Sequence, residues 1–290
     1  MEEVEMVESH SQIQLQPQTL TTPIFKIKVD LLLEALKRVA VKTSATGKQT
    51  QLINDAVIVA KEKTLTIYAG DNVTKAVLVR QVVKGVDVGK EGELILSEID
   101  RVVELLKTFS TLETVKVYVK ENNLVIEREL PYRKVIKLPF TSKKYVEEVY
   151  GVAKEFFSNL KAEVVEGQEF KILKDTKLNI YFKTDTSYLA KAISTASKFT
   201  EKEVIIPFIL TNNKLIIKAG NKVQGFVEEE IPLLKAYGEG RASYQLAIDK
   251  VFDLVKGEVE CWFGNNAPIY IYSTSKEFET EYIIAPISEE

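Results

Sequence analysis

The strongest constraint on how this chain can fold is an internal repeat. The segment Glu91–Lys107, EGELILSEIDRVVELLK, returns as Gly240–Lys256, GRASYQLAIDKVFDLVK. In both copies a short strand-like run leads into an amphipathic helix, and the helices align residue for residue from Ile99 and Ile248 onward. Apolar positions stay apolar and charge signs are kept, which chance alone rarely achieves, so the repeat predicts a duplicated domain.

The runs around the two copies follow one order of predicted elements. A half-buried strand, a helix and three strands occupy 24–82, and the same order returns over 93–138. The double pattern then fills 178–284. The sequence therefore predicts an α+β fold of two tandem domains, each built from two β-α-β-β-β units.

The predicted helices have one apolar face and one charged face. Asp30, Ser97 and Asp185 or Thr186 are suited to cap their N-termini. At helical spacing the inner faces comprise Leu32, Leu36, Val39, Ala40, Ile99, Val102, Val103, Leu106, Leu189, Ala192, Ile193 and Ala196. Cations lie outward on or just after these helices: Lys37, Arg38, Lys42, Arg101, Lys191, Lys198, Lys202 and Lys250. A charged helix face is, by itself, typical of a merely solvated surface.

The remaining segments divide the chain. Residues 1–23 are acidic and then rich in Gln, Ser and Thr, which predicts a disordered tail. Residues 24–140 form the first predicted domain and 178–290 the second. The connector, 141–177, carries Tyr145, Val149, Val152, Phe156 and Leu160 at helical spacing, which predicts an amphipathic helix over Lys143–Ala162 and a polar stretch after it.

The composition excludes several classes of site. The 290 residues are 45% hydrophobic and 28% charged, as in soluble globular proteins. The net charge is only -3, so nucleic-acid contact requires a local basic surface. The sole histidine, His10, lies in the tail, and Cys261 is the sole cysteine, which excludes a Cys/His zinc cluster and a Ser-His-Asp triad in the folded region.

The chain also lacks the usual enzyme signatures. It contains no P-loop and no dinucleotide glycine fingerprint, so we expect no catalytic residues, no cofactor and no metal. No apolar run approaches the roughly 20 residues that span a membrane, and no signal-peptide core is present. One cysteine fits a reducing cytosol, so we expect a cytoplasmic protein.

The doubled β-α-β-β-β pattern and the C-terminal run Glu281-Tyr282-Ile283-Ile284-Ala285-Pro286-Ile287, followed by acidic residues, resemble the DNA polymerase sliding clamps. This family includes proliferating cell nuclear antigen (PCNA) and the bacterial beta clamp, and the resemblance leaves an archaeal or a viral member open. It implies the DNA clamp fold, in which helices line a channel around duplex DNA and sheets lie outside. Six domains complete such a ring, so two per chain imply a homotrimer without an active site.

The resemblance gives roles to individual residues. The eight cations above would face DNA without reading its sequence. Tyr282, Ile284, Ala285 and Pro286 would bind peptides of polymerases and other replication or repair enzymes, although a closing strand with core residues explains them equally. The strands Val115–Val119 and Val223–Glu229 would close the ring.

The implied partners are double-stranded DNA, a DNA polymerase, other clamp-binding peptides and a clamp loader. The implied location is the nucleoid, or a host-cell replication site if the protein is viral. Three alternatives stay open: a monomeric or heterotrimeric processivity factor, a clamp-fold scaffold without a DNA role, and a hydrolase acting through carboxylates.

Overall fold

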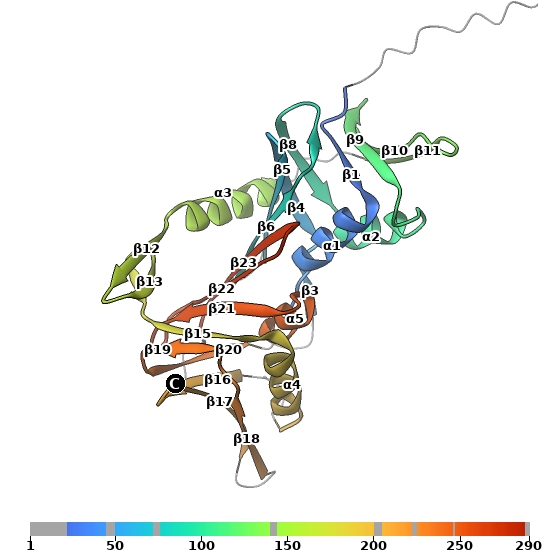
Figure 1. Ribbon diagram of the computed structural model, residues 1–290. Helices are drawn as coiled ribbons and strands as arrows, with labels where there is room; N and C mark the ends of the chain where they lie inside the picture. The colour runs from blue at the N-terminus through green and yellow to red at the C-terminus, as the bar shows by residue number, and fades with distance from the viewer. Residues whose placement is uncertain are drawn as a thin grey trace, which may run out of the picture.

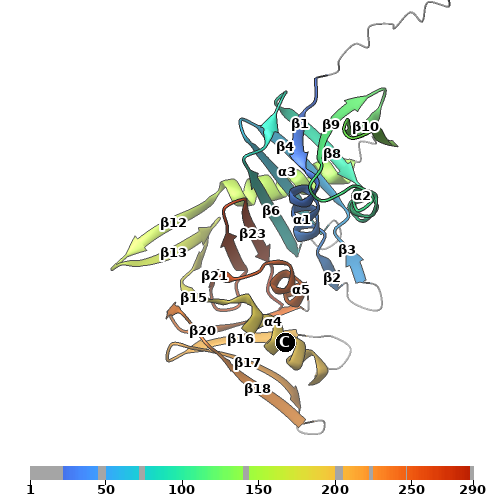
Figure 2. The ribbon, with the colours of Figure 1, turned by 45° about the vertical axis from the view of Figure 1, so that its right-hand side comes forward.

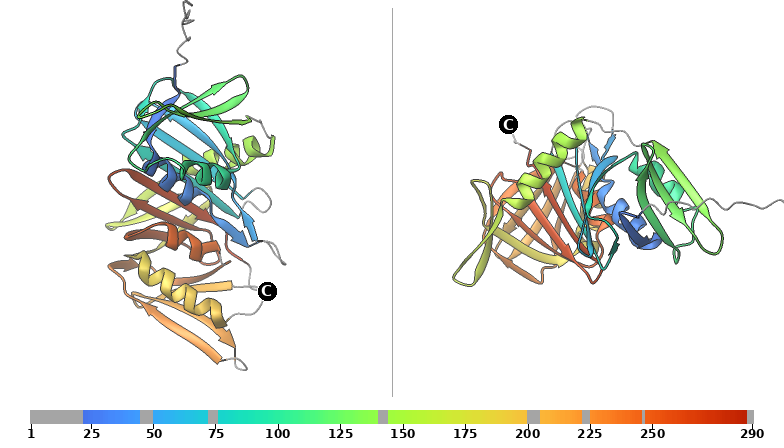
Figure 3. Two further views of the ribbon diagram at one scale, coloured as in Figure 1. Left: turned by 90° about the vertical axis from the view of Figure 1, so that its right-hand side faces the viewer. Right: turned by 90° about the horizontal axis from the view of Figure 1, so that it is seen from above.

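The computed structural model describes residues 22–44, 50–71, 76–139, 144–199, 205–221, 225–245 and 247–287. Two halves follow one another end to end (Figure 1). The helices α1, α2, α4 and α5 lie on one side of the sheets, whereas α3 lies on the opposite side (Figures 1 and 3). The predicted tail, except its last two residues, lies outside the described residues.

The first half contains the predicted β-α-β-β-β order twice. Its first unit comprises β1 (Phe25–Lys28), α1 (Val29–Val39), β4 (Asp55–Lys61), β5 (Thr64–Gly70) and β6 (Val77–Lys84). Its second unit comprises β8 (Gly92–Ser97), α2 (Ile99–Leu106), β9 (Thr114–Lys120), β10 (Asn123–Arg128) and β11 (Lys134–Pro139). The short strands β2 (Lys42–Ser44), β3 (Thr50–Leu52) and β7 (Asp87–Val88) are additions that the pattern did not predict.

The second half repeats this order. Its first unit comprises β15 (Ile180–Asp185), α4 (Thr186–Ala196), the 3-10 helix η1 (Ser197–Phe199), β16 (Ile205–Thr211), β17 (Lys214–Asn221) and β18 (Gly225–Ile231). Its second unit comprises β20 (Gly240–Gln245), α5 (Ala247–Leu254), β21 (Glu258–Phe263), β22 (Ile269–Thr274) and β23 (Phe278–Ile284), with the short β19 (Lys235–Tyr237) between the units. The predicted duplication is therefore confirmed.

The helices bury the faces that their sequences predict. All four predicted inner residues of α2, and all four of α4, are buried, because apolar side chains at helical spacing lose water only on the sheet side. On α1 the buried set extends to Val29, Leu33 and Ala35, while Ala40 follows the helix and is half-buried.

The predicted caps are only partly correct. Asp185 caps α4, accepting a 2.9 Å hydrogen bond from the backbone N–H of Ser187. Asp30, predicted as a cap, lies within the first turn of α1, and the N-cap residue is Lys28. At α2 the N-cap is Glu98 in a left-handed conformation, and the side chain of Asn54 accepts from the backbone N–H of Asp100 at 2.9 Å. This partner comes from a distant loop, so local sequence did not reveal it.

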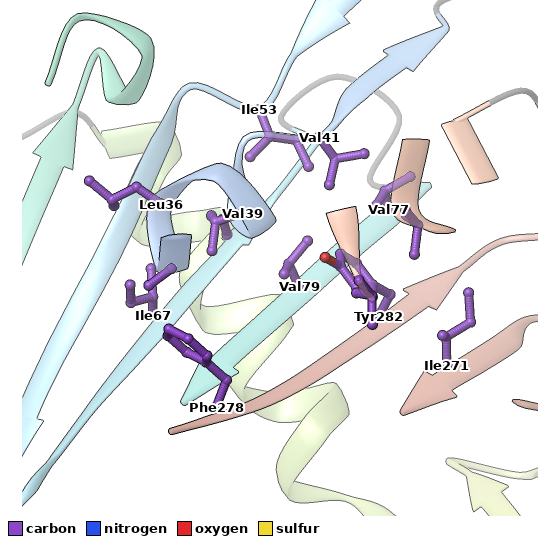
Figure 4. Close-up of a cluster of buried hydrophobic side chains, with 14 of the residues drawn as sticks. Leu36, Val39, Val41, Ile53, Ile67, Val77, Val79, Ile271, Phe278 and Tyr282 are labelled. Atoms are coloured by element: carbon purple, nitrogen blue, oxygen red, sulfur yellow. The ribbon is translucent and has the colours of Figure 1, made fainter. Parts of the chain in front are cut away.

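A continuous sheet joins the two halves. Its nine strands run in the order β19-β15-β21-β22-β23-β6-β5-β4-β8, and the pair β23–β6 links the end of the chain to the first half. In this pair Tyr282 lies opposite Val79, and both side chains are fully buried (Figure 4). The core therefore runs without a break across the junction, which favours a fixed arrangement of the two halves.

The connector differs from its prediction after its helix. The predicted helix is present as α3 (Lys144–Ser158), but the stretch after it forms a sheet of β12 (Leu160–Val165), β13 (Gln168–Leu173) and β14 (Thr176–Leu178). Figure 2 shows β12 and β13 as a hairpin that follows α3. Glu166 and Gly167 both have positive φ, as the tight turn of a two-residue hairpin requires. Leu160 therefore begins a strand, and the Glu-Gly pair was the sequence signal for the turn.

Candidate nucleic-acid face and partner-binding surface

The described helices of the two halves form one row. The helices α1 and α2 pack together, α5 packs beside α1, and α4 packs beside α5. The row α2-α1-α5-α4 runs down one face of the molecule (Figure 3, left). The expected DNA-facing residues Lys37, Arg101, Lys191 and Lys198 are exposed on or directly after these helices. The fold thus brings cations from both halves to one side.

The ion pairing of these cations differs from helix to helix. On α2, Arg101 donates to Glu98 at 3.0 Å, and Lys107, directly after the helix, pairs with Glu104. Lys191 and Lys198 have no ion-pair partner among the residues that the structure describes. Pairs between exposed charges are weak, but they reduce the attraction that a cation offers to a distant phosphate.

Arg38 does not occupy the expected position on the solvent side. Its Nε lies 3.1 Å from Glu34 Oε1, its Nη1 donates to Thr280 Oγ1 at 3.0 Å, and its guanidinium stacks 4.5 Å from the ring centre of Phe278. Only 12% of the side chain is exposed. The Arg38 side chain is long enough to reach Thr280 and Phe278 on β23, the last strand. Arg38 therefore connects α1 to the second half of the chain.

Three expected DNA-facing cations cannot be placed. Lys202 lies outside the described residues. Lys42 begins β2 and Lys250 lies in α5, but their side chains are outside the described set. Their roles remain predictions.

The C-terminal run is largely core. Tyr282 is fully buried, and its hydroxyl donates to the carbonyl of Arg38 at 2.8 Å; Ile284 is 2% exposed. Both therefore act as closing-strand residues, and the expectation that they contact a partner peptide is wrong for the side chains as placed. Ala285 and Pro286 are half-buried, and the Ala285 N–H donates to the carbonyl of Ala76 at 2.8 Å.

A pocket lies at the same end of the sheet as this C-terminal run, where α3 crosses the outer side. It is an open hollow of about 360 Å³, the solvent at its mouth included, and is lined by Ile53, Asn54, Asp55, Ala56, Tyr68, Ala69, Gly70, Val146, Val149 and Tyr150. Gly70 of β5 pairs with Leu78 of β6. The residue before Leu78, Val77, pairs on its other side with Ile284, which directly precedes Ala285. A Cβ on Gly70 would lie 2.9 Å from Val149, so the glycine permits the close approach of α3.

The connector also covers an aromatic cluster that the sequence reading missed. Phe157 of α3 and Leu173 of β13 join Tyr181, Trp262 and Tyr270 on the outer side of the sheet. The ring centres of Tyr181 and Trp262 are 4.9 Å apart. In each strand these aromatic residues alternate with residues that face the helices. The alternation with a period of two was therefore the sequence signal for the cluster.

An ion pair between a half-buried arginine and a buried glutamate crosses the junction beneath this layer. Arg80 of β6 and Glu281 of β23 lie opposite each other and form a hydrogen-bonded ion pair, and the Tyr270 hydroxyl donates to Glu281 at 2.7 Å. Burial raises the pKa of the Glu281 carboxyl, against the opposing effect of Arg80 and the tyrosine hydroxyl. The guanidinium lies 5.7 Å from the ring centre of Phe157, so α3 covers part of the pair, while 26% of the Arg80 side chain stays exposed.

Two sheets end in strands that have no neighbour among the described residues. The five-stranded sheet has the order β11-β10-β9-β1-β7, and the four-stranded sheet has the order β18-β17-β16-β20. The expected ring-closing strand Val115–Val119 is therefore wrong, because β9 lies between β10 and β1. The outer strand is β11, whereas Val223–Glu229 overlaps β18, which does end its sheet.

The described residues contain neither a metal site nor a helix that could span a membrane. Across the described ranges, no group of three or more His, Cys, Asp and Glu side chains could hold a metal ion. No helix in the same part of the chain combines the length and apolarity that crossing a membrane requires.

Comparison with known proteins adds to this geometry. No protein-family model and no curated protein sequence matches the chain. Solved structures do match: PCNA of A. fulgidus, bound to the C-terminal region of FEN-1, has a TM-score of 0.66 at 16% identity, over 92% of this chain and 98% of that chain. This protein has the fold of the PCNA sliding clamps.

Further clamp structures agree over nearly the whole length. The PCNA2–PCNA3 complex of Sulfolobus tokodaii gives a TM-score of 0.65 at 16% identity, over 91% of this chain and 99% of that chain. PCNA of Entamoeba histolytica gives 0.66 at 12% identity, over 92% and 100%. The clamp fold assigned from the internal repeat is thus confirmed, and identities this low concern the fold alone.

Proposed function

We propose that this protein is a DNA sliding clamp, copies of which close into a ring around duplex DNA and tether a DNA polymerase and other replication or repair enzymes. The clamp fold supports this, as does the row of helices whose exposed cations come from both halves. Tethering raises the effective concentration of an enzyme near its substrate, so the ring needs no catalytic group. A separate clamp loader would open it.

The observation that carries the proposal is the strand pairing that joins the two halves of the chain. Inside the chain, β6 pairs with β23. The counterpart of β6 in the second half is β18, and the counterpart of β23 in the first half is β11. These two counterparts are the outer strands of their sheets. Pairing β11 of one copy with β18 of the next would therefore repeat, between chains, the junction that already exists within the chain.

The internal junction also gives the register of the proposed one. Following the ladders strand by strand makes Lys134 the counterpart of Thr280, and Glu229 the counterpart of Gln81. Thr280 lies opposite Gln81 and donates to its Oε1 at 2.7 Å. In the ring Lys134 would therefore lie opposite Glu229 of the next copy, where a cross-strand ion pair replaces a neutral hydrogen bond.

The chemistry of the two edges supports this pairing. The β11 edge is basic, with Arg133, Lys134 and Lys137, whereas β18 carries the acidic run Glu228-Glu229-Glu230. Arg133, Glu228 and Glu230 already pair within the chain, with Glu127, Lys218 and Lys214, so Lys134 and Glu229 carry the complementarity. Large exposed apolar side chains also gather on or beside the two edges: Leu130 (79%), Tyr132 (65%), Phe226 (74%) and Leu234 (62%). Exposed apolar edge strands promote association, so native proteins normally cover them.

A buried arginine beside the β11 edge adds a further sign. Arg128 is 4% exposed and pairs with Glu113, yet its buried Nη2 has no hydrogen-bond partner among the described residues. Buried donors usually find an acceptor. Since Arg128 lies opposite Lys134 in the sheet, an acceptor from the next copy's β18 region would satisfy it.

Both complementary edges belong to one chain, which favours a ring of identical copies. A head-to-tail interface between identical chains closes when its rotation allows, and six clamp domains at two per chain give a trimer. The alternatives are a monomeric factor and a heteromeric clamp. The PCNA2–PCNA3 complex shows that two different chains with this fold can associate.

For enzyme partners we propose docking at the pocket under α3, at the end of the nine-stranded sheet where Ala285 and Pro286 also lie. Its apolar lining from Val146, Val149 and Tyr68 suits one or two apolar anchor side chains of a peptide. Replacing Ala285 and Pro286 with Arg should abolish binding of a polymerase while the mass of the protein stays that of the wild type. Unchanged polymerase binding would place the docking site elsewhere.

Threading through the ring tests the central proposal without a clamp loader. A short fluorescent duplex is titrated with the protein, once with free ends and once with both ends biotinylated and blocked by streptavidin. A preformed ring binds the free duplex and loses affinity for the blocked duplex, because the blocked ends cannot pass. Equal affinity for both would exclude encirclement, and no binding to either would favour the scaffold alternative.

A further inference from the structure

The row of described helices is uneven in charge. Helix α2 carries Arg101 against Asp100 and Glu104, and α1 carries Lys37 and Arg38 against Asp30 and Glu34. In α5 the sequence places Lys250 between Asp249 and Asp253. The continuous segment of α4 and η1, TSYLAKAISTASKF, contains Lys191 and Lys198 and no carboxylate.

The polar groups of α4 share one side of the helix. At 100° per residue, Ser187, Tyr188, Lys191 and Ser194 fall within a sector of about 120°. All four are exposed, Tyr188 to 49%, and Lys198 follows, exposed, in η1. The opposite side, with Leu189, Ala192 and Ile193, is buried against the sheet. This side of α4 therefore presents two ammonium groups and the hydroxyls of Tyr188 and Ser194, while the Ser187 hydroxyl donates to the N-cap carboxylate of Asp185 at 2.5 Å.

This difference decides where a polyanion feels attraction. At physiological salt, charges are screened beyond about 8 Å. On α2, the Glu98 and Glu104 carboxylates lie within ion-pair distance of Arg101 and Lys107, so their fields largely cancel at a phosphate. Lys191 and Lys198 have no such partner among the described residues, so their fields add.

We propose that α4 with η1 is the principal phosphate-contact face of each protomer, so that the duplex runs off-centre in the ring, against α4. This inference rests on the proposed clamp function. Lys191 and Lys198, seven residues apart, reach separate phosphates, and the hydroxyls of Tyr188 and Ser194 donate to phosphate oxygens between them. None of these contacts reads a base, so the duplex can slide along the face.

The position of α4 fits this role. It is the last helix of the row and packs beside β18, the outer strand at which the next copy is proposed to join. A closed ring would therefore carry one such face close to each interface between protomers, separated by helices that carry carboxylates among their cations.

Two charge-matched pairs of substitutions test the inference on the full-length protein. The variant Lys191→Ser/Lys198→Ser removes the two cations of α4, and Arg101→Ser/Lys107→Ser removes the two of α2. Lys161→Ser/Lys276→Ser removes two exposed cations far from the helix row and serves as the control. Affinity for the short free-ended duplex is measured over a range of salt, with light scattering to confirm the assembly.

The α4 variant should lose at least about tenfold in affinity at moderate salt, and its logarithmic salt slope should fall by about 2, since each phosphate contact contributes about 0.9. The α2 variant should lose less than about threefold, and the control should match the wild type. Equal losses of affinity in the α4 and α2 variants, or no loss in either, would overturn the inference about α4. The clamp proposal would still stand in that case if the wild-type protein binds the free-ended duplex more tightly than the blocked one. Loss of that discrimination in the wild type would instead sink the clamp proposal itself.

Discussion

Reversing the charge of Lys134 is the sharpest test of the ring. In the register inferred from the β6–β23 junction, this residue of β11 faces Glu229 of the next copy. Among the described residues of one chain the Lys134 ammonium forms no ion pair: it donates to the carbonyl and hydroxyl of Thr108 at 2.9 and 2.6 Å and lies 4.3 Å from the ring centre of Phe109. Lys134→Glu therefore breaks no ion pair of the monomer, and its main effect should fall on assembly.

The size of the effect follows from the number of interfaces. An opposite-charge cross-strand pair stabilises a sheet by about 0.2–1 kcal/mol, and like charges destabilise it by a similar amount. Changing attraction into repulsion thus costs about 0.4–2 kcal/mol at each interface. A closed trimer has three interfaces, so assembly weakens by about 1–6 kcal/mol, or about one to four orders of magnitude.

Light scattering over a range of protein concentrations measures this directly. Three chains of 32.8 kDa give about 98 kDa for the wild type. Lys134→Glu and Glu229→Lys should each shift the mass toward 32.8 kDa, and the double variant should return to the trimer because it restores an opposite-charge pair. Lys276→Glu, with the same net charge change on an exposed loop, should stay trimeric.

The outcome of the double variant is decisive for the register. Single variants that stay trimeric at all concentrations would show that β11 and β18 do not face each other in this way. A double variant no better than the single ones would show that the two side chains do not meet. A wild-type monomer would remove the self-closed ring and leave the clamp fold standing.

Three further predictions concern stability, each followed by urea unfolding. Asp185→Ala should lower the free energy of unfolding by about 1 kcal/mol at neutral pH through loss of the cap. The hydrogen bonds from Ser187 lower the pKa of Asp185 below 3.8, so the ionised carboxylate stabilises the folded state above that pH. The difference in stability between the variant and the wild type should fade as the pH falls through the lowered pKa. Glu281→Ala should cost about 1–3 kcal/mol because it removes the carboxylate that accepts from Tyr270 and leaves the half-buried Arg80 with Glu279 alone at 3.5 Å, whereas Arg80→Met/Glu281→Met should recover most of that loss. Phe157→Ala should cost about 3 kcal/mol and, by hydrogen exchange, expose α3 more than α1; equal exposure of both helices would contradict a separate outer layer.

The parts that sequence reasoning found depend on local periodicity. The inner faces of α2 and α4 were correct residue by residue, because a helix with one wet side must repeat its apolar positions every three to four residues. The duplicated order of elements was equally readable. The connector sheet was missed because its strands are mostly exposed and carry little alternation, so the Glu166-Gly167 turn was their main signal.

The candidate site shows where such reading fails. Arg38 was placed outward from its helix position, but a side chain this long takes its partners from β23, far away in the sequence. Tyr282 and Ile284 were candidates for partner contact because a run of aromatic and apolar residues has the same sequence whether the core buries it or a partner protein binds it. Their burial follows from the pairing of β23 with β6, which joins the two ends of the chain.

The sequence by itself determined the duplicated units, the helix faces and the lack of histidine or cysteine clusters in the folded region, because these properties are written in local spacing and composition. Only the tertiary structure decided which strands end their sheets, which cations stay free of carboxylates and which C-terminal side chains are covered. These depend on contacts between residues far apart in the chain, and the order of residues alone does not fix such distances.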